Sequence, residues 1–366
     1  MINYFKVGCN FDPDLITIAD ELNDVYKNKG VIKEWFGSSP NYSEMTAKPQ
    51  WRLPNISDKN FENFIKLARD KNQVFNVVLN SIQPFGGKPE MVKHKKEIQD
   101  YVKYLEDIGV YRITFANPMM AMFIREISNI ELEASCILHI DTVTQIKYLH
   151  ETLKVNKICN SILKNRNRDF LKNTANYCLS NNMIFELLAN EFCYNARSNY
   201  ATHCIYRDSC YLAHATCSTK EESMSYKNYP MKNCMFSRNG NHAAWLKSRW
   251  ISPNDLNEYN KLGINYFKIS GRTGSVDYIK KLMESYMRQQ FNGNLLELWK
   301  PLETIYNGKS EKEQELIDNI PTKKLKGFLD HWMLQNFECE NQICGETCNY
   351  CNEFYDKHIK EKNIDI

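Results

Sequence analysis

Short runs of apolar and β-branched residues recur along the chain, and amphipathic stretches separate most of them. One such stretch, Lys93–Ile108, places Ile98, Val102, Leu105 and Ile108 on one face, the spacing of a helix packed against a core. The apolar runs themselves predict eight β-strands. They are Tyr4–Cys9, Val31–Gly37, Val74–Asn80, Tyr111–Ala116, Glu131–Cys136, Lys157–Ser161, Met183–Ala189 and Asn265–Ser270.

Eight strands that alternate with helices favour a parallel sheet, and eight is the number that closes into a (β/α)8 barrel. A doubly wound open sheet is the alternative, but it needs a glycine-rich phosphate turn after the first strand. The chain reads GCNFDPD there, which lacks that fingerprint. We therefore predict an α/β fold, a TIM-like (β/α)8 barrel.

The regular spacing breaks once, where about 75 residues separate the seventh predicted strand from the eighth. This is longer than a barrel connection usually is, and it leaves the end of the strand where barrel enzymes keep their active sites. We expect a functional loop at 190–240. We divide the chain into a barrel at 1–290, ending with a helix at Ser275–Gln290, a helical linker at 291–330 and a cysteine-rich segment at 331–366.

Composition narrows the setting of this fold. The chain has 366 residues, of which 43% are hydrophobic, and a net charge of only +3, so no global basic field favours wrapping nucleic acid. No run of eighteen apolar residues predicts a membrane span, and the charged N-terminal segment does not resemble a signal peptide. We expect a cytoplasmic protein whose 13 cysteines are reduced.

Five of these cysteines fall in the long insertion. Four thiolates can hold a zinc ion or an iron–sulfur cubane, and the wide gaps between these cysteines favour the larger cluster over the tight pairs of zinc fingers. Ordinary buried or free thiols are the simpler alternative. We predict a 4Fe–4S cluster on Cys193, Cys204, Cys210 and Cys234, with Cys217 as the reserve ligand.

A second group has the spacing C-x4-C-x3-C-x2-C near the C-terminus, at Cys339, Cys344, Cys348 and Cys351. Four thiols in so short a segment can close an S4 shell around a metal. Zinc as a structural ion and a second 4Fe–4S cluster as an electron relay both stay open, as does a redox tail without metal. We favour the cluster, because one is already predicted in the barrel loop.

Polar residues gather where the predicted strands end, and a barrel would bring them to one opening. His139 falls at the end of its strand and titrates near neutral pH, and arginine clamps carboxylates and phosphates. We predict His139, Arg168 and Arg272 as catalytic or binding residues for a polar or anionic substrate. Asparagines at strand ends can instead cap the next helix; they include Asn117, Asn167 and Asn190.

Several motifs resemble those of one known family. NYFKISGR (Asn265–Arg272) resembles the FKIEGR-type signature of the collagenase-like peptidase family U32, and the flanking WISPNDLNEYNKLGI and YIKKLMESYMRQQFNGNLLEL are similar to that family's flanks. FELLANEFC and HCIYRDSC resemble its cysteine-bearing regions. WFGSSP, FNVVLNS, ANPMM and NRNRDF are similar to a clostridial-type branch, so the resemblance covers nearly the whole chain.

The resemblance implies a barrel with a 4Fe–4S cluster on four cysteines. Despite the peptidase name, several relatives act in oxygen-independent hydroxylation of the ubiquinone ring, a ribosomal RNA cytidine or a tRNA uridine, some of them as paired subunits. Two departures stand out: Ser270 replaces the signature glutamate, and the cysteine spacing differs, with Cys210 where related sequences have a histidine.

Three functions remain in view. We favour an enzyme of oxygen-independent hydroxylation, or a related redox modification, of an RNA, quinone-like or other small substrate. A peptidase is the second, although no HExxH or GxSxG motif occurs and Cys9 is the one thiol placed as a lone nucleophile. The third is an RNA-binding or scaffold protein whose phosphate-binding patch would be Arg197, Arg207, Arg238, Lys247 and Arg249.

Overall fold

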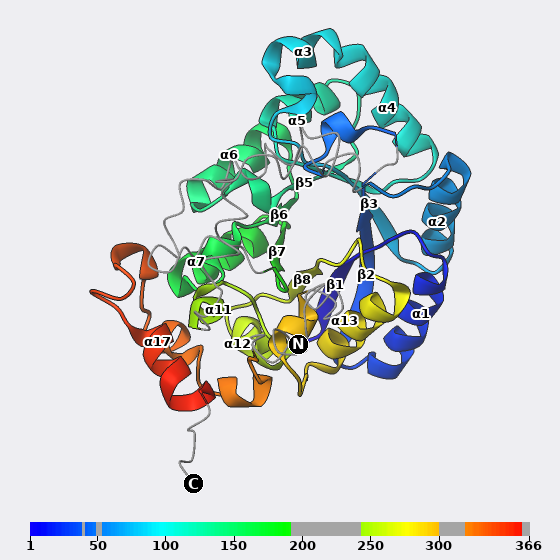
Figure 1. The fold of residues 1–366 in the computed structure, drawn as a ribbon. Coiled ribbons are helices and arrows are strands. Elements are labelled where there is room, and N and C mark those ends of the chain that lie inside the picture. The colour runs from blue at the N-terminus through cyan, green and yellow to red at the C-terminus, as the bar shows by residue number, and fades with distance from the viewer. Residues whose placement is uncertain (39–40, 49–52, 192–242, 300–318, 361–366) are drawn as a thin grey trace, which may run out of the picture.

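A closed barrel of eight parallel strands, neighbouring one another in sequence order, forms the centre of the computed structural model (Figure 1). The structure describes residues 1–38, 41–48, 53–191, 243–299 and 319–360. All eight predicted strands are present, with ends within two residues of those predicted. They are β1 (Asn3–Gly8), β2 (Gly30–Gly37), β3 (Val74–Leu79), β4 (Arg112–Phe115), β5 (Glu131–Ala134), β6 (Lys157–Cys159), β7 (Ile184–Leu188) and β8 (Tyr266–Ile269).

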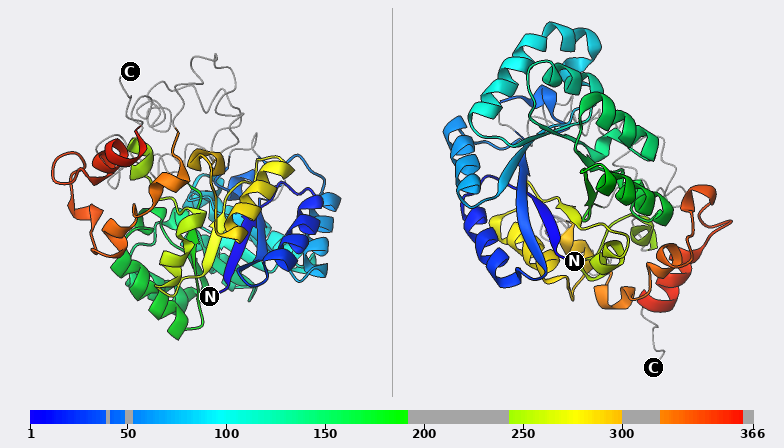
Figure 2. Two further views of the ribbon diagram at one scale, coloured as in Figure 1. Left: turned by 90° about the horizontal axis from the view of Figure 1, so that it is seen from below. Right: turned by 180° about the vertical axis from the view of Figure 1, so that it is seen from behind.

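Helices surround the barrel (Figures 1 and 2). Their buried apolar residues and those of the strands form one hydrophobic core. In α2, for example, Phe61, Phe64 and Ile65 share one buried face, and the Ser57 side chain caps the first turn. The helices are α1 (Asp14–Tyr26), α2 (Asp58–Asp70), α3 (Lys88–Lys93), α4 (Lys95–Asp107), α5 (Pro118–Arg125), α6 (Val143–Leu153), α7 (Arg168–Ser180), α11 (Ala243–Lys247), α12 (Leu256–Asn260), α13 (Val276–Arg288), α16 (Asp330–Met333) and α17 (Tyr350–Phe354).

Two predicted helix boundaries change slightly. The helix expected from Lys93 begins at Lys95, because His94 has non-helical backbone angles and divides α3 from α4. The helix expected at Ser275–Gln290 is α13, in which Ser275 is the N-cap and accepts a hydrogen bond from the Tyr278 amide. It ends at Arg288 because the next residue, Gln289, adopts a left-handed conformation.

The interior of the barrel is charged rather than filled with aliphatic side chains. Its buried polar residues come from every strand: Lys6, Glu34, Asn76, Arg112, Thr114, Glu133, Lys157, Glu186 and Lys268. Barrel interiors are usually packed with branched apolar residues. Here the apolar residues of the strands form the core shared with the helices, and a network of ion pairs fills the centre.

Residues 319–360, called the C-terminal segment from here on, pack against the outside of the barrel, beside α7 and α11 (Figure 1). Lys164, in the loop between β6 and α7, pairs with Glu340 at 3.0 Å, and Asn336 donates a hydrogen bond to Asp169 at 2.8 Å. The rings of Trp250 and Phe328 stack, with centroids 5.9 Å apart. The segment that carries the four C-terminal cysteines is therefore attached to the β6–α7 side of the barrel by both polar and aromatic contacts.

No helix in the part of the chain that the structure describes is long and apolar enough to cross a membrane.

Candidate functional site

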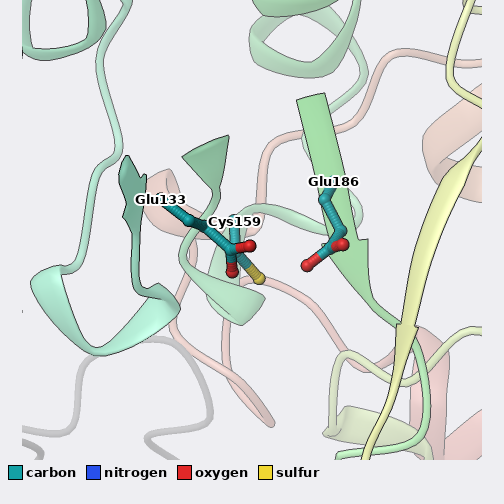
Figure 3. A group of neighbouring side chains, drawn as sticks. All are labelled: Glu133, Cys159 and Glu186. Atoms are coloured by element: carbon teal, nitrogen blue, oxygen red, sulfur yellow. The ribbon is translucent and has the colours of Figure 1, made fainter. Parts of the chain in front are cut away.

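Two carboxylates and a thiol meet in the barrel interior. Glu133 on β5, Cys159 on β6 and Glu186 on β7 place one ligand atom each within 4.8 Å of the others, and they are the sole such group among the described residues (Figure 3). Both carboxylates, however, already bind ammonium groups. Lys6 lies 2.7 Å from Glu186, and Lys157 lies 2.6 Å from Glu186 and 3.4 Å from Glu133. These lysines take the place of a metal, so we assign the group a structural role.

The charges in this network hold one another ionised. Burial alone would raise the pKa of Glu133, but Lys6, Lys157 and Lys268 together lower that pKa to about 2. The pKa of Glu34 also lies well below its usual value, because Arg112 and Lys157 outweigh the effect of burial. Four cations and three carboxylates thus form a rigid charged interior beneath the mouth of the barrel.

A pocket of about 230 Å³ opens where β1, β2 and β8 end. Arg272 lines it, and its Nη1 donates a hydrogen bond to Ser38 Oγ at 2.7 Å. Burial lowers the pKa of Arg272 to about 10, so the guanidinium stays charged at neutral pH. Lys48 adds a second cation to the same lining, and Asn10 and Asn55 add amides. This combination of charge and hydrogen-bonding groups suits a small anion.

The structure separates the other two predicted site residues from this pocket, whose lining contains neither of them. His139 follows a short 3-10 helix at Cys136–Leu138 and has a left-handed backbone, with φ of 54°. Arg168 is the first residue of α7 and lies 3.8 Å from the carboxylate of Asp169. The chemical roles of both remain predictions.

Several mouth asparagines have the capping or bracing role that we considered as an alternative. Asn117 accepts hydrogen bonds from the first amides of α5, and Asn167 accepts one from Phe170 in α7. Asn190 bonds both the amide and the carbonyl of Ser270, joining the ends of β7 and β8. These residues shape the mouth of the barrel.

Thiols near the mouth differ in their readiness to ionise. Burial raises the pKa of Cys9 to about 12, which makes the predicted lone nucleophile a poor one. A hydrogen bond with Cys159 lowers the pKa of Cys136 to about 7, with help from the charge of Lys268. Among the described thiols near the mouth, Cys136 is thus the one closest to the thiolate form at neutral pH.

The first predicted cluster site, with Cys193, Cys204, Cys210, Cys217 and Cys234, lies outside the described residues. Glu191 is the last described residue before this site, and one of its carboxylate oxygens accepts a hydrogen bond from Ser270 Oγ at 3.5 Å. A carboxylate that follows β7 therefore lies beside Ser270, which stands where the FKIEGR-type signature has a glutamate. The described residues resume at α11, which packs against α17 of the C-terminal segment.

The four C-terminal cysteines are described, and three contacts define their setting. Trp332 Nε1 donates a hydrogen bond to Cys339 Sγ at 3.0 Å. Backbone pairing joins Cys344 to Cys348, and the Gly345 amide donates to the Cys348 carbonyl at 2.8 Å. Cys351 Sγ lies 4.0 Å from the carbonyl oxygen of Leu246 in α11. Both the barrel and the segment itself therefore position these thiols.

Zinc and a 4Fe–4S cluster hold their thiolates at different separations. A tetrahedral zinc ion with Zn–S bonds of about 2.3 Å holds its sulfurs about 3.8 Å apart. In the described part of the chain no three of these cysteines bring their sulfurs within 4.8 Å of one another. A 4Fe–4S cluster keeps its thiolates farther apart, because each binds a different iron. The four thiols are therefore not gathered as tightly as a bound zinc ion would hold them, and the donor set itself suits either group.

Two buried arginines flank the cysteines. Arg166, in the β6–α7 loop, is only 2% exposed, and its Nη1 donates to the Leu246 carbonyl at 2.7 Å. Its Nε and Nη2 are buried without a hydrogen-bond partner. Arg249 is 4% exposed, and Cys339 and Cys351 raise its pKa against the opposing effect of burial. Buried cations of this kind require an anion nearby, and metal-bound thiolates would supply it.

Arg249 also changes one of our predictions. It and Lys247 are each 4% exposed, so these two residues do not contribute to an exposed phosphate-binding patch. Arg197, Arg207 and Arg238 lie outside the described residues.

Sequence reasoning missed Arg166 although it selected Arg168 from the same segment, NRNRDF. The two arginines lie two residues apart, and each follows an asparagine. Arg168 starts α7 at the surface, whereas Arg166 enters the core. No signal in a single sequence separates them, because only the fold determines which one faces the cysteines.

The chain is similar to several known proteins. No family model matches the chain. The uncharacterized protease MJ1657 of Methanocaldococcus jannaschii is 26% identical over 348 residues, which cover 94% of this chain and 95% of that protein. Among solved structures, the U32 peptidase Mk0906 matches 74% of this chain and 93% of its own, with 12% identity and a TM-score of 0.46. A GH113 β-1,4-mannanase matches 78% and 98%, with 8% identity and a TM-score of 0.34.

The fold defines the class of the protein, a (β/α)8 barrel with a long insertion after β7. The full-length similarity to a protein named as a protease agrees with the motifs in the sequence. Both observations agree with the resemblance of the sequence motifs to the U32 family of collagenase-like peptidases.

Proposed function

We propose that this protein is an iron–sulfur enzyme that carries out an oxygen-independent hydroxylation, or a related redox modification, of a polar or anionic substrate. The observation that carries the proposal is the C-terminal site, where four thiols lie beside two buried arginines, one of which has two buried N–H groups without a hydrogen-bond partner. Bound there, a 4Fe–4S cluster would supply one-electron transfer. The cluster predicted on Cys193, Cys204, Cys210 and Cys234 would be the second such centre.

The mouth pocket supplies the substrate side of the proposal. Arg272 and Lys48 would hold an anionic group, and Ser38 keeps the guanidinium in place. Hydroxylation without dioxygen takes its oxygen atom from water or from a hydroxylated organic donor. When water is the source, one C–H bond is replaced by C–OH, two protons go to solvent, and two electrons pass one at a time through the proposed clusters to an external electron acceptor. The substrate would be an RNA, a quinone-like ring or another small molecule. The enzyme would act on it alone or with a partner subunit.

Metal analysis tests the proposal directly. Protein purified without oxygen is expected to be brown, to absorb at about 400 nm and to contain iron and sulfide. Cys344→Ser should lose the iron and sulfide of one cluster. Cys178→Ser is the matched control, because Cys178 is a buried thiol within α7. Wild-type protein with zinc and no iron would contradict the proposal.

A peptidase is the second candidate, because the full-length relative is named a protease. The nucleophile would then be Cys136 and not Cys9, because the pKa of Cys136 is about 7 and that of Cys9 is about 12. This candidate predicts cleavage of gelatin or unfolded peptides that persists after the iron is lost and disappears in Cys136→Ser. No cleavage by wild-type protein excludes it.

A further inference from the structure

Arg166 is a cation buried among aromatic rings. Its charge acts on the Asp255 carboxyl, but burial raises the pKa of that carboxyl to about 7, so Asp255 balances only part of the charge. Its guanidinium carbon lies 5.0 Å from the ring centre of Trp250, 4.9 Å from that of Phe328 and 4.6 Å from that of Trp332. Cation–π contacts offset part of the lost hydration. Two buried N–H groups remain without an acceptor, and no ion pair involves Arg166 among the described residues.

The same neighbours that hold Arg166 also hold the cysteines. The Leu246 carbonyl accepts the hydrogen bond of Arg166 at 2.7 Å and faces Cys351 Sγ at 4.0 Å. The guanidinium of Arg166 lies over the face of the Trp332 ring, and the indole Nε1 of Trp332 donates a hydrogen bond to Cys339 Sγ at 3.0 Å. Arg249 lies over that ring too, at 5.9 Å. The cation and two of the thiols therefore share two fixed anchors.

We propose that Arg166 is the buried counter-charge of the iron–sulfur centre on Cys339, Cys344, Cys348 and Cys351, and that it raises the reduction potential of that centre. The inference rests on the C-terminal cluster of the proposed function. Four thiolates outweigh the positive charge of a 4Fe–4S core, so the centre is an anion that becomes more negative on reduction. A cation held nearby favours the reduced form. Arg166 is a positioning residue, since it acts through the charge and orientation of the site.

Redox titration of the anaerobic protein, followed by electron paramagnetic resonance, tests this role. The C-terminal centre is identified as the signal that Cys344→Ser removes. Arg166→Met keeps the length of the side chain and removes its charge. It is expected to make one-electron reduction at least tenfold less favourable, equivalent to a fall of about 59 mV in potential. Arg166→Lys retains the charge and should lie between wild type and Arg166→Met.

Arg125→Met is the matched control. Arg125 is a half-buried arginine that donates to the Leu153 and Ile130 carbonyls at the start of β5 and β6, the opposite end of the barrel from the Arg166 loop. Its substitution should leave the potential unchanged.

The outcomes separate this inference from the proposed function. Full iron content with an unchanged potential in Arg166→Met overturns the inference and leaves the cluster in place. Absence of any signal or iron that depends on Cys344 overturns the proposed C-terminal cluster itself. When Arg166→Met loses its iron, Arg166→Lys decides. Iron restored by lysine supports the charge role, and iron still absent in a folded Arg166→Lys protein overturns it.

Discussion

The indole Nε1 of Trp332 donates a hydrogen bond to Cys339 Sγ at 3.0 Å, while the face of the same ring lies 4.6 Å from the guanidinium of Arg166. One side chain from α16 therefore contacts both a thiol of the C-terminal site and its buried cation. Hydrogen bonds to the ligand sulfurs and nearby charge are two of the factors that set the potential of an iron–sulfur cluster. These two contacts would therefore tune the potential of the cluster that we propose for this segment.

Trp332→Phe should lower the reduction potential of the C-terminal centre by less than Arg166→Met does. Phenylalanine keeps a ring against Arg166 but removes the N–H that stabilises the added negative charge on sulfur. Redox titration of the Cys344-dependent signal measures the change. Trp35→Phe removes an indole N–H that donates to Gln73 within the barrel and should leave the potential as it is. Equal potentials in wild type and Trp332→Phe would show that the hydrogen bond does not tune the centre.

Glu133→Gln should lower the free energy of unfolding by about 3–5 kcal/mol, because it leaves buried ammonium groups short of a counter-charge. Lys6 and Lys157 are each 1% exposed and lie next to this carboxylate. Urea unfolding followed by circular dichroism measures the loss. Glu97→Gln, on the exposed face of α4, should change stability little. Adding Lys6→Met should recover part of the loss, since the pair is then removed together.

The same carboxylates predict how stability depends on pH. The folded-state pKa of Glu133 is about 2, below its ordinary value of 4.5, and that of Glu34 is lowered in the same direction. A depressed pKa contributes stability that is complete above pH 4.5 and is lost as pH falls toward 2. Thermal unfolding across this range should show a steep acid limb in wild type. The limb should be shallower in Glu133→Gln, and identical slopes would exclude the assignment.

Arg272→Met should weaken the binding of small anions at the mouth pocket. The substitution removes the buried guanidinium that Ser38 positions in the lining. Inorganic phosphate and small carboxylic acids should raise the melting temperature of wild type more than that of the variant. Arg288→Met, in the exposed last turn of α13, is the control and should respond like wild type. Equal responses of Arg272→Met and wild type would remove Arg272 from the binding site.

The repeat of apolar runs and amphipathic stretches was sufficient to predict the barrel. Each strand must bury one face beneath a helix, so its pattern is local, and all eight predicted strands agree with the structure within two residues. Cysteine spacing was likewise readable, because four thiols within thirteen residues can reach one site whatever surrounds them. The segment from Cys339 to Cys351 was therefore predictable as a unit.

Only the tertiary structure decided what surrounds these features. Lys6 and Glu133 pair across the barrel interior because closure of the sheet makes β1 face β5, and no local pattern encodes that pairing. Arg166 and Arg168 look alike in the sequence, yet the turn into α7 buries the first and leaves the second partly exposed. The sequence by itself determined which elements form and where the thiols lie along the chain. The fold decided which charges face them, because that depends on contacts between residues far apart in sequence.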